Sequence, residues 1–165
     1  MRPSSALFWS AVFFLIAPGT LAGYLPWAIT DWRLGSAPAW LMALGGVAIV
    51  GGLLLLLECF GRFALQGRGT PAPVAPPERL VVAGPYRRVR NPMYVAVVAI
   101  ILGQAALFAD VRLLVYGVSV WLGFHAFVVL YEEPTLRRTF PNDYPAFAAA
   151  VPRWRPRLRP WRPAA

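Results

Sequence analysis

The sequence contains no lysine, a single cysteine, a single histidine and few acidic side chains. Charged residues make up 14% of its 165 positions, whereas a water-soluble domain usually carries about a quarter. The lone Cys59 excludes an internal disulfide and any metal site built from several cysteines. The length corresponds to one domain, residues 1–165. We therefore expect a single domain that lacks the polar surface required for solubility.

Apolar residues and arginine take the place of the missing types. Hydrophobic residues account for 58% of the chain, and 16 basic residues against 7 acidic ones give a net charge of +9. A charge of this size is typical of nucleic-acid-binding proteins when it lines a soluble face. Here the arginines flank long apolar runs, which favours membrane lipids as partners and excludes nucleic acid. The sequence predicts an all-α integral membrane protein.

Four apolar runs approach or exceed the roughly 20 residues that cross a bilayer as a helix. The expected transmembrane helices cover residues 6–29, 38–60, 92–109 and 112–131. A signal peptide is the alternative for the first run, whose apolar stretch exceeds the typical length of about 7–15 residues. The last two runs are expected to form an antiparallel helical hairpin. Gly19 and Gly23 have the GxxxG spacing of close helix contacts, so a homodimer through this face is one expectation.

The distribution of arginine predicts the orientation of the chain. The linker after the first run carries only Arg33, which Asp31 balances, whereas loop 61–91 and tail 132–165 hold most of the other arginines. Positively charged loops stay on the cytoplasmic side of a membrane. We therefore expect a multi-pass protein of a bacterial-type inner membrane, with both termini, the loop and the tail in the cytoplasm.

Two segments carry more specific residues than a membrane span requires. Residues 84–94 read Gly-Pro-Tyr-Arg-Arg-Val-Arg-Asn-Pro-Met-Tyr and lead into the third run. Asn91 is the expected N-cap of that helix, and Pro92 suits its first position. The second segment begins with Glu132 and Glu133, directly after the fourth run. The hairpin brings both segments to the same membrane face, where they are expected to form one site.

The residue types of this site match a ligand with both anionic and cationic groups. A helix N-terminus near arginines attracts a carboxylate, and a pair of glutamates attracts a cation or accepts hydrogen bonds from hydroxyls and amines. Tyr86 and Tyr94 are able to stack on a flat ring or to hold a positive centre against their faces. S-adenosylmethionine, with a carboxylate, an ammonium, a sulfonium, a ribose and an adenine, has all of these groups.

The same segments resemble the membrane methyltransferase family of isoprenylcysteine carboxyl methyltransferases and bacterial phospholipid N-methyltransferases. The family pattern is Gly-x-Tyr-x-x-x-Arg-His-Pro-x-Tyr, a helical hairpin, Glu-Glu-x-x-Leu-x-x-x-Phe-Gly-x-x-Tyr and Val-Pro-Arg, and the match covers residues 78–156. Asn91 stands where the family has His, and Pro141 where it has Gly. Val128 stands where the eukaryotic prenylcysteine enzymes have an arginine linked to substrate, which weighs against a prenylcysteine carboxylate as acceptor.

The resemblance implies transfer of a methyl group from S-adenosylmethionine to a lipophilic or small acceptor, which is a carboxylate, an amine or a thiol, at the cytoplasmic membrane face. It gives Glu132 and Arg90 catalytic roles. The cofactor-binding residues that it implies are Glu78, Arg79, Leu80, Val81, Tyr86, Asn91, Pro92, Met93, Tyr94, Glu132 and Glu133. No metal site is expected. The alternative is a non-catalytic four-helix membrane scaffold or lipid-binding protein.

His125 and Val128 are the candidate substrate contacts. His125 is the only histidine and lies within the fourth run, where polar groups are costly and often functional. Its spacing from Glu132 predicts that both lie on about the same helix face, two turns apart. His125 is therefore a candidate for a binding group or a base in the substrate pocket. The alternative is a histidine that hydrogen-bonds to a neighbouring helix.

Overall fold

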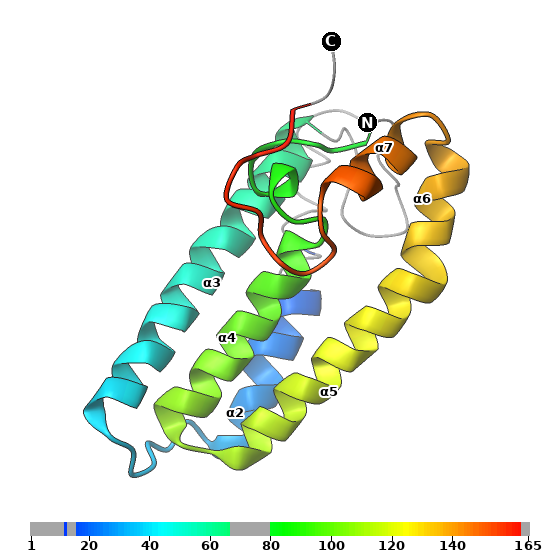
Figure 1. The fold of residues 1–165 in the computed structure, drawn as a ribbon. Coiled ribbons are helices and arrows are strands. Elements are labelled where there is room, and N and C mark those ends of the chain that lie inside the picture. Colours follow the sequence, from blue (N-terminus) through cyan, green and yellow to red (C-terminus); the bar gives the residue numbers. More distant parts are fainter. Residues whose placement is uncertain (1–11, 13–15, 67–79, 163–165) are drawn as a thin grey trace.

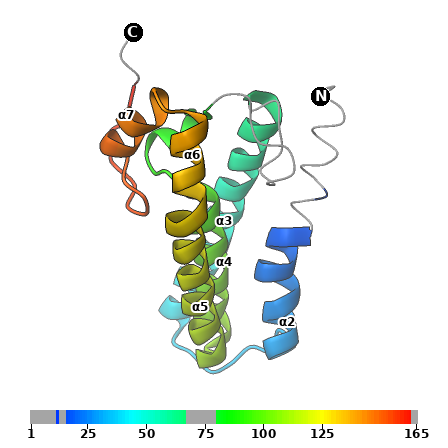
Figure 2. The same ribbon diagram turned by 90° about the vertical axis from the view of Figure 1, so that its right-hand side faces the viewer.

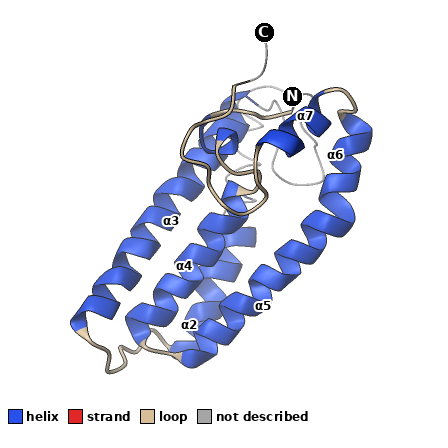
Figure 3. Ribbon diagram, viewed as in Figure 1, coloured by secondary structure: helices blue, strands red, loops and turns tan. Residues whose placement is uncertain are grey.

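The computed structural model describes residue 12 and residues 16–66 and 80–162. Every regular element in these residues is a helix, as the ribbons of Figures 1 and 3 show. Three long helices lie side by side, and Figure 2 shows a shorter one beside them: α3 (Ala39–Gln66), α4 (Pro92–Phe108), α5 (Val111–Phe127) and α2 (Leu25–Thr30). The expected all-α fold is confirmed for the described part of the chain.

The first predicted span, residues 6–29, lies only partly within the described residues. From residue 16 the chain is helical through to Thr30, and η1 (Thr20–Tyr24) within it is a π-helix that leads into α2. A Cβ atom added to Gly23 would meet nothing within 4 Å. The face that carries this glycine is therefore open in the single chain, and the expected homodimer stays a prediction.

Side chains of the neighbouring helices hold this first helix in place. Pro26 has no amide N–H to donate back into the preceding turn. The carbonyl oxygen of Leu21 instead accepts a hydrogen bond from Tyr116 Oη at 2.9 Å, and that of Ala22 accepts one from Gln104 Nε2 at 2.7 Å. Hydrogen bonds between helices stabilise packing in an apolar medium. These two fasten the first helix to α4 and α5.

Glycines allow α3 and α4 to approach each other closely. A Cβ atom added to Gly45 would lie 2.5 Å from the carbonyl oxygen of Gly103, and one added to Gly103 would lie 2.8 Å from the carbonyl oxygen of Gly45. Gly52 also faces α4, since its Cβ would lie 2.9 Å from the carbonyl oxygen of Ala96. Small residues of this kind bring helix backbones together in lipid. The two helices therefore form one closely packed pair.

Two of the described helices are long and apolar enough to cross a membrane, Ala39–Arg62 and Val111–Thr139. Only 17% of the most apolar window of each is buried inside the molecule, so most of their apolar side chains face outward. A helix in the core of a soluble protein would be mostly buried, and these exteriors therefore indicate a membrane protein. α4 is apolar too but has 17 residues, and the four crossings expected from the sequence stay a prediction.

Two of the predicted spans end later than expected. α3 continues past residue 60 to Gln66, and α5 continues without a break through the π-helix η3 (Val128–Glu132) into α6 (Glu133–Thr139). Hydropathy marks the part of a helix that suits lipid, whereas residues with good helix propensity, polar or apolar, extend the helix beyond that part. Glu132 and Glu133 accordingly lie inside a long helix. The region expected to be a tail contains a further helix, α7 (Asp143–Ala150).

The two ends of the bundle differ in charge. At one end, Asp31 pairs with Arg33 at 4.0 Å and Asp110 pairs with Arg112 at 2.7 Å. The other end carries the start of α4, the 3-10 helix η2 (Gly84–Arg87), α6, α7 and the arginine-rich segment after it (Figure 1). We refer to this second end as the basic end. Both segments singled out in the sequence lie there.

Replacing Gly45 by alanine is expected to lower the free energy of unfolding by about 1–3 kcal/mol, because the added methyl group enters filled space. Gly46 is the matched control, since a Cβ atom there would meet nothing within 4 Å. Gly46→Ala should leave the stability unchanged or raise it by up to about 1 kcal/mol, because alanine favours a helix over glycine. Denaturant unfolding in detergent, followed by circular dichroism, measures both changes. Equal destabilisation by the two variants would contradict the close contact.

Candidate functional site

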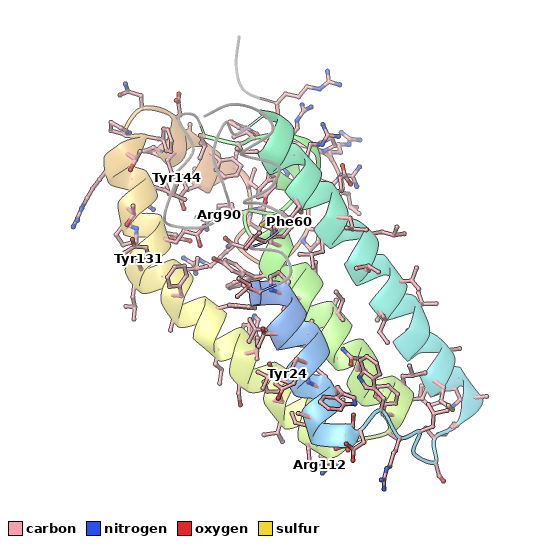
Figure 4. All side chains as sticks on the ribbon, turned by 180° about the vertical axis from the view of Figure 1, so that it is seen from behind. Tyr24, Phe60, Arg90, Arg112, Tyr131 and Tyr144 are labelled. Carbon is pink, nitrogen blue, oxygen red and sulfur yellow. The ribbon has the colours of Figure 1, made fainter. Side chains whose placement is uncertain are left out.

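A cavity of about 170 Å³ lies at the basic end, between the first helix, α3, α4 and the long helix formed by α5, η3 and α6. Most of its lining is apolar, and its polar side chains gather where α4 begins. The lining residues are Ala17, Pro18, Leu21, Leu56, Phe60, Tyr86, Arg90, Asn91, Pro92, Met93, Tyr94, Val97, Phe124 and Glu132. Figure 4 shows Phe60, Arg90 and Tyr144 at this end of the bundle and Arg112 at the opposite end.

Tyr94 on α4 and Glu132 on η3 meet at this cavity although they are 38 positions apart in the sequence. Tyr94 Oη donates a hydrogen bond to Glu132 Oε2 at 3.0 Å. The ring of Tyr94 also packs on Phe124, with the ring centroids 4.5 Å apart. Glu132 ends a π-helix, and such interruptions of an α-helix are frequent at functional sites. The structure thus brings together the two segments that the sequence suggested.

Arg90 is held beside the cavity by two partners. Its Nη1 contacts Glu133 Oε1 at 3.0 Å and donates a hydrogen bond to Tyr144 Oη at 3.2 Å. Glu133 also accepts two hydrogen bonds from Arg153, at 2.6 and 3.1 Å. These bonds raise the pKa of Arg153 above its ordinary value, so its guanidinium stays charged. Arg90 Nε is buried and has no hydrogen-bond partner among the described residues.

The segment after α7 is bonded along the segment that precedes α4. The amide N–H of Arg90 donates to the carbonyl oxygen of Pro152 at 2.9 Å, and Asn91 Nδ2 donates to the carbonyl oxygen of Arg153 at 3.1 Å. Asn91 occupies the N-cap position of α4, but its side chain makes no capping hydrogen bond. The expected N-cap position of Asn91 and the place of Pro92 in the first turn are therefore confirmed, whereas the side chain of Asn91 bonds to the adjacent segment and not to the first turn of α4.

Tyr86 contributes an aromatic wall from η2. Gly84 has a φ of +53°, and an added Cβ atom would lie 2.9 Å from side-chain atoms of both Glu58 and Arg62. Only glycine meets both conditions without strain. The Tyr86 side chain is buried, and burial raises the pKa of its phenol well above the ordinary value. Tyr86 therefore stays neutral at physiological pH.

Four of the predicted cofactor-binding residues precede η2, and the two of them that the structure describes do not line the cavity. Leu80 packs against the hydrophobic cluster of Tyr144, Phe147 and Val151. Val81 is half-buried but is not among the lining residues. Glu78 and Arg79 lie outside the described residues.

The two candidate substrate contacts also lie away from the lining. Val128 is buried, and His125 Nδ1 accepts a hydrogen bond from Trp154 Nε1 at 3.0 Å. Of His125 and Glu132, only Glu132 lines the cavity. The π-helix between them shifts the helical phase, so the spacing rule for a regular α-helix does not apply. The partner of His125 comes from the segment after α7 and not from a neighbouring helix.

The apolar side of the cavity was not predicted from the sequence. Leu56 and Phe60 come from α3, Phe124 from α5, and Ala17 and Pro18 from the first helix. All five are ordinary members of long apolar runs, and no local pattern separates those that line a cavity from those that face lipid. Gln104 does not line the cavity, but as a polar residue within the third run it did indicate a contact between helices, because polar groups inside a membrane span usually have a partner. That partner is the carbonyl oxygen of Ala22 in the first helix.

Asn91→Ala is expected to loosen the segment after α7, because it leaves the carbonyl of Arg153 without its donor. Amide hydrogen exchange of Arg157 and Trp161, whose N–H groups bond to the segment before α4, should accelerate by about tenfold, the equivalent of one lost hydrogen bond. Asn142→Ala is the control, because Asn142 is exposed and makes no capping bond. Unchanged exchange in Asn91→Ala would show that this bond does not hold the segment.

Comparison with known proteins adds one finding. The model of the family described as phospholipid methyltransferase matches residues 40–143, more than half of the chain. The matched range runs from the second residue of α3 to the first residue of α7 and includes Arg90, Tyr94 and Glu132. No curated protein and no solved structure matches the chain. The chain belongs to the phospholipid methyltransferase family.

Proposed function

We propose that this protein transfers a methyl group from S-adenosylmethionine to a lipophilic or small acceptor at the cytoplasmic face of a membrane. Its family supports a membrane methyltransferase. The observation that carries the proposal is the hydrogen bond between Tyr94 and Glu132 at the cavity. A non-catalytic scaffold has no use for a carboxylate that is turned into a largely apolar cavity, where its charge is costly.

The side chains around the cavity fit the chemical groups of S-adenosylmethionine. Glu132 offers carboxylate oxygens to hydroxyl or amine donors, and Arg90 has a buried Nε without an acceptor among the described residues. Tyr86 and Tyr94 offer aromatic faces to a ring or a positive centre. The cavity of about 170 Å³ is smaller than the roughly 300–1,000 Å³ of typical ligand pockets. It therefore has room for one end of such a ligand.

The bound cofactor would supply a methyl group on a sulfonium, whose leaving group is a neutral thioether. The residues of the chain then have two main tasks, which are alignment of the acceptor and exclusion of water. Leu56, Val97 and Phe124 keep part of the cavity apolar. A carboxylate or thiolate acceptor needs no base, whereas an ammonium must first lose a proton. Glu132 lines the cavity, and the proposal assigns it the role of accepting that proton.

The proposed orientation puts the basic end in the cytoplasm, with four crossings and both termini on that side. The support is the difference between the two ends of the bundle. Acidic partners pair with Arg33 and Arg112 at one end. At the other end, exposed arginines accumulate directly after η2, on α6 and in the segment after α7. Unbalanced arginine stays on the cytoplasmic side of membrane proteins.

Purified protein in detergent is expected to bind S-adenosylhomocysteine in a calorimetric titration. Glu132→Gln and Tyr94→Phe should each weaken binding by about tenfold or more, because the first removes the negative charge of the carboxylate and the second removes the phenol hydroxyl, both at little change in volume. Asp143→Asn is the matched control, since Asp143 is an exposed carboxylate at the start of α7. It should bind like the wild type.

The same titration separates the enzyme from the non-catalytic alternative. A wild-type protein that does not bind S-adenosylhomocysteine, or that binds as tightly after both cavity substitutions, would contradict the proposed site. Incubation with methyl-labelled S-adenosylmethionine and membrane lipid extracts then identifies the acceptor. Label in the organic phase indicates a lipophilic acceptor, and label in a small water-soluble product indicates a small one.

Cysteine labelling tests the orientation. In a Cys59→Ala background, Asp110→Cys should react with a membrane-impermeant maleimide in intact cells, because Asp110 lies at the end opposite the basic end. Asp143→Cys should react only in inside-out vesicles. The reverse pattern would contradict the orientation, and labelling of both positions from one side would contradict the hairpin.

A further inference from the structure

Glu133 forms the centre of a charged cluster beside the cavity but does not line the cavity itself. Its Oε1 contacts Arg90 Nη1 at 3.0 Å and Arg153 Nε at 2.6 Å, and its Oε2 accepts from Arg153 Nη2 at 3.1 Å. Two guanidinium groups thus share one carboxylate. One positive charge in this cluster is left without a counter-charge inside it.

The uncompensated positive charge lies on the cavity side of the cluster. Arg90 lines the cavity, whereas Glu133 and Arg153 do not. Nη1 of Arg90 binds Glu133 and Tyr144, but its buried Nε has no acceptor among the described residues. The side chains of Arg90 and Glu133 are 12% and 10% exposed. A buried donor that remains unpaired is costly, so an anionic ligand group at this place would satisfy it.

The carboxylate of Glu133 is what makes this arrangement possible. Without it, the guanidinium groups of Arg90 and Arg153 would face each other in a partly buried setting and repel. Tyr144 also restricts the position of the Arg90 guanidinium, because Arg90 Nη1 donates a hydrogen bond to Tyr144 Oη at 3.2 Å. Both Arg153 and Tyr144 lie beyond the family-matched range. Residues after the family-matched range therefore help to hold Arg90, which lies within that range.

We propose that Glu133 is a positioning residue, which together with Arg153 and Tyr144 holds the Arg90 guanidinium ready to bind the carboxylate of the cofactor's amino-acid portion. This inference rests on the proposed function. It divides the tasks of the two adjacent glutamates, since Glu132 faces the ligand and Glu133 faces the arginine. The direct cofactor contact implied for Glu133 by the sequence resemblance is replaced by an indirect role.

Two ligands that differ in the amino-acid portion test this role. S-adenosylhomocysteine carries the carboxylate, and 5′-methylthioadenosine has the same thioether nucleoside without it. The wild type should bind the first more tightly. Glu133→Gln keeps the shape of the side chain but removes its charge, and should weaken S-adenosylhomocysteine by about tenfold or more. Binding of 5′-methylthioadenosine should change by less than about twofold, because the nucleoside does not use Arg90.

A second variant covers the case in which Glu133→Gln does not fold. Tyr144→Phe keeps the ring within its hydrophobic cluster and removes only the oxygen that accepts from Arg90. It should produce the same selective loss of S-adenosylhomocysteine to a smaller degree. Asp143→Asn, one residue away, removes an exposed carboxylate and should alter neither ligand. Thermal unfolding of each variant without ligand reports separately on the fold.

The outcomes distinguish this inference from the proposed function. A wild type that binds neither ligand contradicts the proposed function. A wild type that binds S-adenosylhomocysteine no more tightly than 5′-methylthioadenosine overturns the carboxylate contact of Arg90. Equal weakening of both ligands in Glu133→Gln and Tyr144→Phe, or no weakening in either variant, overturns the positioning role and leaves the proposed function intact.

Discussion

The ion contacts of Glu133 are the interaction on which the basic end depends. They join three parts of the chain that lie far apart in the sequence, because Arg90 precedes α4, Glu133 begins α6 and Arg153 follows α7. A buried charge without partners is strongly destabilising, and a buried ion pair is tolerated only when further hydrogen bonds complete it. Arg153 binds Glu133 through two nitrogens, and Tyr144 takes the second contact of Arg90. The side of the cavity that Arg90 lines is therefore fixed relative to α6 and to the segment after α7.

The bundle below this cluster relies on close packing and specific hydrogen bonds. Helices in lipid gain little from apolar burial against each other, because lipid chains are as apolar as leucine. The glycines between α3 and α4 compensate by bringing two backbones into contact. The first helix is held differently, through hydrogen bonds that Gln104 and Tyr116 donate to its backbone. The cavity lies where the closely packed pair meets the first helix and α5.

Both π-helices of the described chain border this cavity. Leu21 of η1 and Glu132 of η3 are lining residues. A π-helix is uncommon and less favourable than a regular α-helix, so neighbouring contacts must stabilise it. The side-chain hydrogen bonds to η1 and the Tyr94–Glu132 bond provide such contacts. An irregular helix next to the cavity changes the direction of its side chains, whereas regular helices would pack side chains against each other along their whole length.

Features that depend on local pattern are predictable from the amino-acid sequence. The apolar run at 92–109 became α4, and the residues from Arg90 to Tyr94 reached the cavity, because composition and short-range motifs govern helix formation and termini. Other features depend on the helical phase, which sets the helix face on which a side chain lies, or on partners that are distant in the sequence. These features followed only from the tertiary structure. The π-helix set Glu132 apart from His125, the continuation of α5 moved both glutamates into a helix interior, and the segment after α7 gave Asn91, His125 and Glu133 their partners. No local pattern records a contact between residues so far apart in the chain.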